Sequence, residues 1–407
     1  MTSKPLNNHP IFIILFVAIG VKPLLTSISV VAPIHYNLVI AGFVIISSIL
    51  LSVSGSRLFL IRPLFYFILY LTFSLFWSES FITSISYYFK YLSYASIFFL
   101  VYIWAKNNNS DFLLKFILYS SLIPITYGIV QMVLEDYHNF YVSYEMIILS
   151  QRAIRSFFMH PNDFGVFLIA IFAVKLSFFI KPRYSDKAMN WIFLLGIVFF
   201  VYQTHARVAF AGFFVVTSLF FMVAMNMKYK IIITYFMAFI LIGILLYFIY
   251  FGMSDSSSGK SINSLWWRFR VWGMLIQHVE GLAIFFGNGL GFSKELLLNE
   301  YSFLQVLNPH SGYIRLYLEI GIIGVSIYLY TLYYSTIRAY RIIINRINYS
   351  DTLFQLSFIT LSINLSAVVM SITENILFNL SYQWILWTVN ALFFVSRAKE
   401  KNKIRVH

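Results

Sequence analysis

The chain has 407 residues, of which 60% are hydrophobic, 20% are aromatic and only 11% are charged. Water-soluble domains carry about 25% charged residues, so this composition excludes a soluble globular fold and predicts a chain that folds within lipid. The chain contains no cysteine, which excludes disulfides and thiolate metal sites. The formal net charge is +14, and its meaning depends on where the charged residues lie.

Twelve apolar segments are candidates to cross a bilayer as helices, since one crossing needs roughly 20 mostly apolar residues; the seventh is short. They predict an all-α integral membrane protein of about 12 transmembrane helices, organised as one polytopic domain over residues 1–407. The first segment is not followed by a small-residue cleavage site, so we expect a retained helix rather than a signal peptide. The predicted spans are residues 11–31, 36–54, 58–77, 84–105, 112–134, 163–180, 190–204, 207–227, 231–251, 312–337, 352–373 and 377–396.

The positions of Lys and Arg orient these spans. If the N-terminus is cytoplasmic, the inner side collects 19 of the 29 Lys and Arg residues and only four of the 15 acidic residues. This bias follows the positive-inside rule and predicts that both termini are cytoplasmic. The positive charge therefore reports topology, and no nucleic acid is expected as a partner. Ten cations do not follow the rule and need a separate explanation: Lys22, Lys90, Arg152, Arg155, Arg207, Lys260, Arg268, Arg270, Lys294 and Arg315.

Two connections on the predicted outer side are long and polar. The first covers residues 135–162 and contains Arg155, His160 and Asn162. The second covers residues 252–311, between the ninth and tenth predicted spans, and begins with a Ser-rich stretch that is typical of a loop. We expect the chemistry of the protein to lie in this second connection.

An amphipathic helix is predicted within the second connection, over residues 265–280. Ser264 can cap this helix, and apolar residues then recur at helical spacing, which predicts one apolar stripe resting on the outer membrane surface. The stripe consists of Leu265, Phe269, Trp272, Ile276 and Val279.

Two arginines of this helix point in different directions. Arg268 flanks the stripe one turn before Trp272, whereas Arg270 lies about 160° further round, at about 100° per residue. Each could bind a substrate phosphate through its planar guanidinium or extend to lipid phosphates. The lipid interpretation has more weight for Arg270 than for Arg268. Arg207, at the start of the eighth span, offers the same planar group, with lipid anchoring as its alternative.

The tenth span begins with further polar residues. His310 could act as a base or donate a hydrogen bond to phosphate, and a histidine satisfied by a carbonyl is the alternative. Arg315 and Glu319 are four residues apart and could form an ion pair within the helix or belong to a site. No set of His and carboxylate residues has metal-ligand spacing, so neither a metal nor another cofactor is expected.

Glycines mark two further positions. Gly287, Gly289 and Gly291 alternate and predict a tight turn where backbone could approach a ligand. This is not a dinucleotide fingerprint, because no strand–turn–helix unit surrounds it. Gly321 and Gly324 permit close helix packing in the tenth span.

Five motifs in this order resemble the O-antigen ligase/polymerase superfamily of bacterial polysaccharide assembly. Each motif is weak alone, but their order on twelve spans with a long outer loop is specific. The sequence departs from the family at Ser311, where Asn is common, and at His205, which interrupts a stretch of small residues. The motifs are an aromatic-His-Pro-Asn segment at 157–165, a small-residue-Arg segment at 204–207, Arg268 with Trp272, a Gly-rich turn at 287–291, and a His-led helix at 310–324.

The resemblance implies a metal-independent membrane glycosyltransferase. Its donor and acceptor would be glycans on undecaprenyl diphosphate at the periplasmic face of the bacterial inner membrane, among membrane lipids. The segment around His160 is more similar to the polymerase branch, which implies polymerisation of repeat units into O-antigen, capsule or exopolysaccharide, with a chain-length regulator as a partner. One alternative is a ligase that transfers glycan to lipid A–core. Another is a polysaccharide transporter or flippase, a class that places charges near the bilayer midplane.

For this reaction, the leaving diphosphate must be stabilised and the acceptor hydroxyl must be activated. The candidate catalytic residues are Arg207 and Arg268 for the diphosphate, His310 as the base or a phosphate contact, and Glu319 to orient His310 or Arg315. Trp266, Trp267 and many tyrosines could stack on sugars, with packing at the lipid interface as the alternative. The candidate substrate-binding residues are Arg155, His160, Asn162, Arg270, Trp272, Tyr313 and Arg315.

Overall fold

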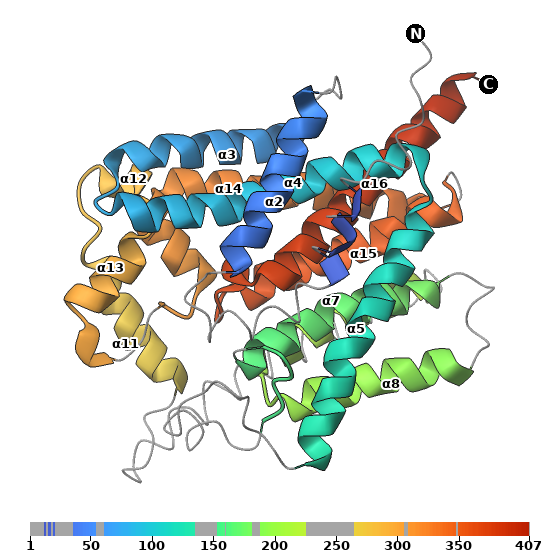
Figure 1. Ribbon diagram of the computed structural model, residues 1–407, viewed down its shortest axis with the longest axis horizontal. Coiled ribbons are helices and arrows are strands. Elements are labelled where there is room, and N and C mark those ends of the chain that lie inside the picture. The colour runs from blue at the N-terminus through green and yellow to red at the C-terminus, as the bar shows by residue number, and fades with distance from the viewer. Residues whose placement is uncertain are drawn as a thin grey trace.

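In the computed structural model, helices are the regular secondary structure of the described residues, which contain no β-strand (Figure 1). The described residues are 12–13, 15–17, 19–20, 36–53, 61–134, 153–158, 160–180, 188–224, 264–304, 308–346 and 349–406. The predicted ninth span, most of the first span, the Ser-rich stretch, Lys22, Arg152 and Lys260 lie outside this part of the chain.

Five described helices are long and apolar enough to cross a membrane. Each corresponds to a predicted span, so the all-α membrane architecture is confirmed, while the count of twelve spans and the periplasmic position of the long connection stay predictions. The five helices are α5 (Ser110–Val133), α7 (Pro161–Phe178), α9 (Arg207–Ala224), α14 (Gly312–Ile344) and α15 (Asp351–Met370).

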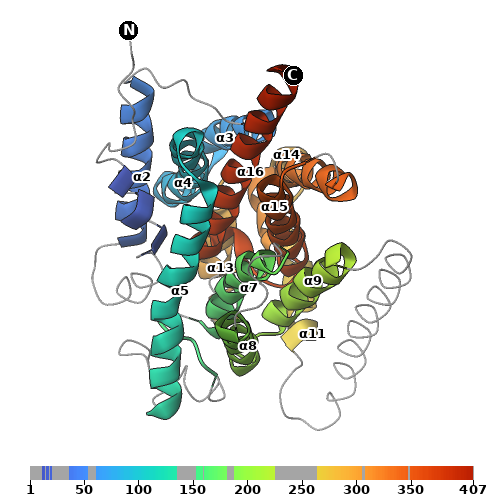
Figure 2. The same cartoon turned by 90° about the vertical axis from the view of Figure 1, so that its right-hand side faces the viewer.

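Other helices complete the bundle around a central helix, α16. Figure 2 shows α16 running between α4 and α15, and it also packs against α7. The remaining long helices are α2 (Tyr36–Val53), α3 (Arg62–Ser74), α4 (Phe81–Asn107), α8 (Ala188–Gln203) and α16 (Leu380–Val406). The 3-10 turns η2 (Leu75–Trp77), η4 (Ser302–Leu304) and η6 (Ile376–Phe378) join them.

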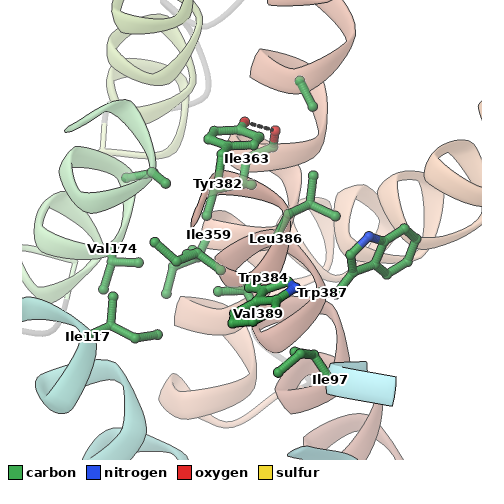
Figure 3. Packing of buried hydrophobic residues seen from close by; sticks show 14 of the residues in the cluster. Ile97, Ile117, Val174, Ile359, Ile363, Tyr382, Trp384, Leu386, Trp387 and Val389 are labelled. Carbon is green, nitrogen blue, oxygen red and sulfur yellow. Dashed lines mark hydrogen bonds between the residues drawn. The ribbon is translucent and has the colours of Figure 1, made fainter. Parts of the chain in front are cut away.

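The first part of α16 is buried on all sides, as expected of a helix inside a bundle. Trp384 and Trp387 are 1% and 2% exposed. Figure 3 shows them among aliphatic side chains from neighbouring helices, with the Tyr382 hydroxyl donating to the carbonyl of Ile363 at 2.7 Å. Asn390 Nδ2 also donates to Asn364 Oδ1 of α15 at 3.0 Å, a polar contact of the kind that joins helices in lipid.

Residues 264–304 form a small unit at one end of the bundle, which we call the cap (Figure 1). It contains α11 (Ser264–Ile276), α12 (Ala283–Phe286) and α13 (Phe292–Asn299). A separate apolar core joins the cap to the start of α14 and consists of Val271, Leu275, Val279, Leu296, Leu297 and Leu318.

The predicted apolar stripe of α11 is wrong in part. Val271 and Leu275 are buried, whereas Phe269 is 50% exposed and Ile276 is 39% exposed. The helix carries apolar residues on two adjoining faces, and the face with Val271 and Leu275 is the one covered by α13 and α14. Spacing alone could not choose between these faces.

The Gly-rich turn brings the cap backbone against the backbone of α14. Gly321 interrupts α14 with φ 61° and ψ −173°, so the preceding carbonyl groups lose their helical partners. The carbonyl of Leu318 accepts a hydrogen bond from the N–H of Asn288, and that of Glu319 accepts one from the N–H of Gly289, both at 2.9 Å. A Cβ at Gly287 would lie 2.3 Å from the nitrogen of Ile320. The close approach predicted for this turn is therefore made to α14.

Gly287→Ala is expected to lower the free energy of unfolding by about 3 kcal/mol or more, because it combines a backbone clash with a positive φ. Thermal unfolding in detergent, followed by circular dichroism, measures the loss. Gly196→Ala in α8 is the control. A Cβ there meets nothing within 4 Å, so this change is expected to be neutral or stabilising by about 0.5–1 kcal/mol. Equal melting temperatures for the two variants would contradict the tight contact.

Candidate functional site

Several helix ends meet beside the cap. The N-terminal ends of α7 and α9 lie close together, since a Cβ at Gly165 would be 2.8 Å from the Cβ of Ala209 and 3.1 Å from that of Ala206. The start of α14 reaches the end of α15, where the N–H of Gly312 donates to the carbonyl of Ser371 at 2.9 Å. Because helix N-termini carry partial positive charge, their meeting at one point favours an anion.

Glu374, just after α15, lies at the centre of the polar side chains in this region. Its Oε2 accepts a hydrogen bond from Asn162 Nδ2 at 2.6 Å. Its Oε1 lies 3.7 Å from His310 Nδ1, which is beyond hydrogen-bond distance and makes the contact one of charge. We call Glu374, Asn162, His160, His310 and Arg268 the Glu374 cluster.

The charges of the cluster fix the protonation state of its carboxylate. Burial alone would raise the pKa of Glu374, but the interactions with His310, Arg268 and His160 lower it to about 2. Burial lowers the pKa of His160, and Glu374 opposes this effect. At neutral pH, Glu374 is therefore an anion and His160 is neutral.

The cap helix α11 supplies Arg268 to the cluster. Its Nη1 donates a hydrogen bond to the carbonyl of Thr373, next to Glu374. Burial lowers the pKa of Arg268, the charge of Glu374 raises it, and the nearby charge of Arg207 lowers it again. Arginine is effectively always protonated in proteins, so the guanidinium is charged at neutral pH.

The same helix positions His310 from two sides. Trp272 Nε1 donates to the carbonyl of Pro309 at 2.6 Å, and the ring of Trp267 lies 6.2 Å from the His310 ring, centroid to centroid. The backbone of His310 has a φ of 52°, a left-handed conformation that few residues other than glycine adopt. Its N–H donates to Asn308 Oδ1 at 3.0 Å. Such a strained backbone, held by several contacts, is a feature of functional sites.

His160 and Arg155 approach the cluster from the start of α7. His160 Nδ1 caps the helix by accepting a hydrogen bond from the N–H of Asn162 at 3.1 Å. Arg155 is 4% exposed and lies within electrostatic reach of His160. Its segment is anchored on α5, where the N–H of Ser156 donates to Gln131 Oε1 at 2.8 Å.

Arg207 is the first residue of α9 and is exposed. Its charge acts on Arg268, so two arginines from separate elements face one region. An arrangement of two arginines, two histidines and three helix N-termini is suited to a multivalent anion such as a diphosphate.

The sequence model of a protein family described as O-antigen ligase matches residues 191–329. The matched region contains Arg207, Arg268, the Gly-rich turn and His310. This match, over about a third of the chain, supports a place in the O-antigen ligase/polymerase superfamily. A comparison with curated proteins found no match. The matched family is one of O-antigen ligase/polymerase-type proteins, which act on lipid-linked glycans.

The structure separates the candidate residues into groups. His160, Asn162, Arg268 and His310 come together around Glu374, while Arg155 lies near His160 and Arg207 near Arg268. Arg270 is exposed on α11, and the described residues show no contact between it and the cluster. Tyr313 is half-buried, and its hydroxyl donates to the carbonyl of Val368 at 2.8 Å. Trp272 holds the residue before His310.

Arg315 and Glu319 form a different group, in the first turns of α14. Arg315 Nε donates to Glu319 Oε1 at 3.0 Å, and Ser293 Oγ donates to the same oxygen at 2.6 Å. Both charged side chains are buried, at 4% and 0% exposed. In this structure, Glu319 is therefore the partner of Arg315 and not of His310.

Sequence reasoning missed Glu374. The residue lies in the short connection between the eleventh and twelfth predicted spans, and its only signal in the sequence is an acidic residue at the outer end of a span. Its contact with Asn162 joins positions 212 residues apart. Among the described residues, no group of three or more His, Asp or Glu residues is placed to hold a metal ion.

Proposed function

We propose that the protein is a membrane glycosyltransferase that polymerises repeat units carried on undecaprenyl diphosphate. The observation that carries this proposal is the meeting of Arg268 and His310, from separate elements, at Glu374 and the neighbouring Thr373 carbonyl, with Arg207 near Arg268. The proposed location is the bacterial inner membrane, with this site facing the periplasm and both termini in the cytoplasm. The products would be O-antigen, capsule or exopolysaccharide.

The arginines stabilise the leaving diphosphate. When the bond between the sugar and the diphosphate breaks, negative charge develops on the phosphate oxygen, and fixed positive groups lower the barrier most effectively. Arg268 uses one N–H to fix its position on the Thr373 carbonyl. A guanidinium has five N–H donors, so others remain to bind phosphate. Arg207 and the N-terminal ends of α7 and α9 add positive potential to the same region.

His310 is the base for the acceptor hydroxyl. The hydroxyl oxygen attacks the anomeric carbon, the carbon–oxygen bond to the diphosphate breaks, and the hydroxyl proton passes to His310 Nε2. Glu374, 3.7 Å from Nδ1, stabilises the imidazolium that results. His160 has a different role: its Nδ1 accepts from Asn162, so the proton of its neutral ring is on Nε2 and is available to a phosphate oxygen.

The segment around His160 supports a polymerase over a ligase, because its His-Pro-Asn-Asp sequence resembles the polymerase branch. The positions of the charged groups support an enzyme over a transporter. The cluster gathers at helix ends, whereas transporters tend to place such groups near the bilayer midplane. A polymerase in this pathway would work with a chain-length regulator protein.

Purified protein in detergent is expected to convert lipid-linked repeat units, extracted from the same bacterium, into a ladder of polymer. The reaction would proceed with a metal chelator present and without any nucleotide, and the Arg268→Ala variant is the negative control. Polymer resolved by gel electrophoresis measures the product. If transfer occurs only when lipid A–core is added, the protein is a ligase. If neither acceptor yields product, the proposal is wrong.

A further inference from the structure

Two cations share one pair of aromatic rings beside the Glu374 cluster. The guanidinium carbon of Arg315 lies 3.4 Å from the ring centroid of Phe378 and 4.4 Å from that of Tyr87. The ammonium of Lys90, on α4, lies 5.1 Å and 5.0 Å from the same two rings. Lys90 and Arg315 therefore act as a pair, which we call the Lys90–Arg315 pair.

The charge of this pair is not balanced within the described residues. Glu319 is the single carboxylate bonded to it, through Arg315 Nε. Lys294 adds further positive potential around Lys90. Glu295 is the other nearby acid, so two carboxylates face the three cations Lys90, Arg315 and Lys294, and one positive charge is left over.

Hydrogen bonding is also incomplete at the pair. Arg315 Nη2 is buried without a partner among the described residues. For Lys90 Nζ, the same part of the chain offers the two ring contacts and no hydrogen bond. A contact between a cation and a ring contributes about 0.5–2 kcal/mol, whereas an uncompensated charge in an apolar bundle costs several kcal/mol. The pair therefore lacks an anion.

The pair and the Glu374 cluster lie on the same two segments. Arg315 is five residues after His310 in the chain, and Phe378 is four residues after Glu374. The start of α14 and the segment around η6 thus contribute residues to both groups. Lys90 is only partly buried, which leaves an approach to the pair from outside the bundle.

We propose that Lys90 and Arg315 bind the phosphate of the acceptor lipid, while Arg207 and Arg268 bind the diphosphate of the donor. This inference rests on the proposed function, because a polymerase that joins two lipid-linked repeat units must hold two lipid phosphates at one membrane surface. Arg315 is well suited to this task, since Glu319 and Ser293 fix its guanidinium and Nη2 remains to bind.

Binding stoichiometry tests the two sites without any sugar. Purified full-length protein is titrated with farnesyl diphosphate by isothermal calorimetry. We expect two molecules per chain for the wild type, one for Lys90→Ala and one for Arg268→Ala. Lys294→Ala is the matched control, because it removes a neighbouring cation that does not contact the rings, and it should retain both sites. Two sites in Lys90→Ala would overturn the proposal.

Competition separates the sources of phosphate. Inorganic pyrophosphate should compete with farnesyl diphosphate at both sites, since the shared chemistry is phosphate. Nanodiscs of phosphatidylglycerol should leave the Lys90-dependent site available. If they block this site at equal lipid and probe concentrations, Lys90 and Arg315 hold a phospholipid headgroup and the proposal fails.

Kinetics assigns the second site to the acceptor. A donor repeat unit whose accepting hydroxyl is capped is mixed with an uncapped acceptor, so each KM is measured separately. Lys90→Ala should raise the KM of the acceptor at least tenfold and leave that of the donor within twofold, and Lys90→Arg should restore most of the loss. Equal changes in both values would reject the assignment. Two binding sites without any polymer would instead reject the proposed function.

Discussion

Arg268→Ala is expected to lower kcat for glycan polymerisation by about 10²–10³-fold, the usual cost of removing one donor that stabilises developing negative charge. The structure gives the reason: Arg268 is held on the Thr373 carbonyl, beside Glu374 and within electrostatic reach of Arg207. Release of undecaprenyl diphosphate from purified lipid-linked repeat units measures the rate.

Two companion variants make this result specific. Arg268→Lys keeps the charge but loses the planar fork, so it should recover only a small part of the activity. Arg270→Ala removes an exposed arginine two residues away on the same helix and should change kcat less than threefold. Comparable losses in Arg268→Ala and Arg270→Ala would show that the overall charge of α11 matters rather than the Glu374 cluster.

Glu374→Gln is expected to lower kcat about 10²-fold, because the imidazolium of His310 loses the anion 3.7 Å from its Nδ1. The amide that replaces the carboxylate still offers an oxygen to Asn162, so the variant removes charge and keeps that hydrogen bond. Asn162→Ala is the complementary variant, since it removes the hydrogen bond and keeps the charge. Asn162→Ala should lower kcat less than Glu374→Gln does. If Asn162→Ala lowered kcat more than Glu374→Gln, the role of Glu374 would be structural only.

The same carboxylate predicts a pH dependence of stability. Its pKa falls from 4.5 to about 2, so the folded state favours the ionised form. A group with a lowered folded pKa contributes stability that is complete above the unfolded pKa and is lost as the pH falls through the folded one. The contribution is on the order of 3 kcal/mol and should disappear between about pH 4.5 and pH 2. Glu374→Gln should flatten this part of the curve in thermal unfolding experiments, and an unchanged slope would contradict the assignment.

Arg207 and Arg268 could be identified from the sequence because the positive-inside rule did not account for them, and His310 because it stands at the start of a predicted span. Glu374 could not, since that rule weighs acidic residues little and the partners of Glu374 lie far away in the chain. Asn162 is 212 positions from Glu374, and Arg268 is 105 positions from Thr373. Helical periodicity reports neighbours within a few residues and contains no information about such pairs.

Among the helices, too, some features could be predicted from the sequence and others could not. Long apolar segments predicted α7, α9 and α15 well, because a membrane span is specified by its own composition. The buried face of α11 depended on which neighbour covered it, and the sequence of one helix cannot state that. The break at Gly321 was also hidden, because residues 312–337 form one apolar segment of ordinary length.

The break at Gly321 divides α14 into two parts whose side-chain directions are determined by different neighbours. Ahead of Gly321, the direction in which Arg315 and Glu319 face is set by the cap, through the hydrogen bonds from Asn288 and Gly289. Beyond it, the direction of each side chain is set by the surrounding helices. One residue added beyond the break would turn the membrane half by about 100° and leave the polar half aimed as before. The lipid-facing sequence of α14 is thus free to diverge without altering the aim of its polar residues.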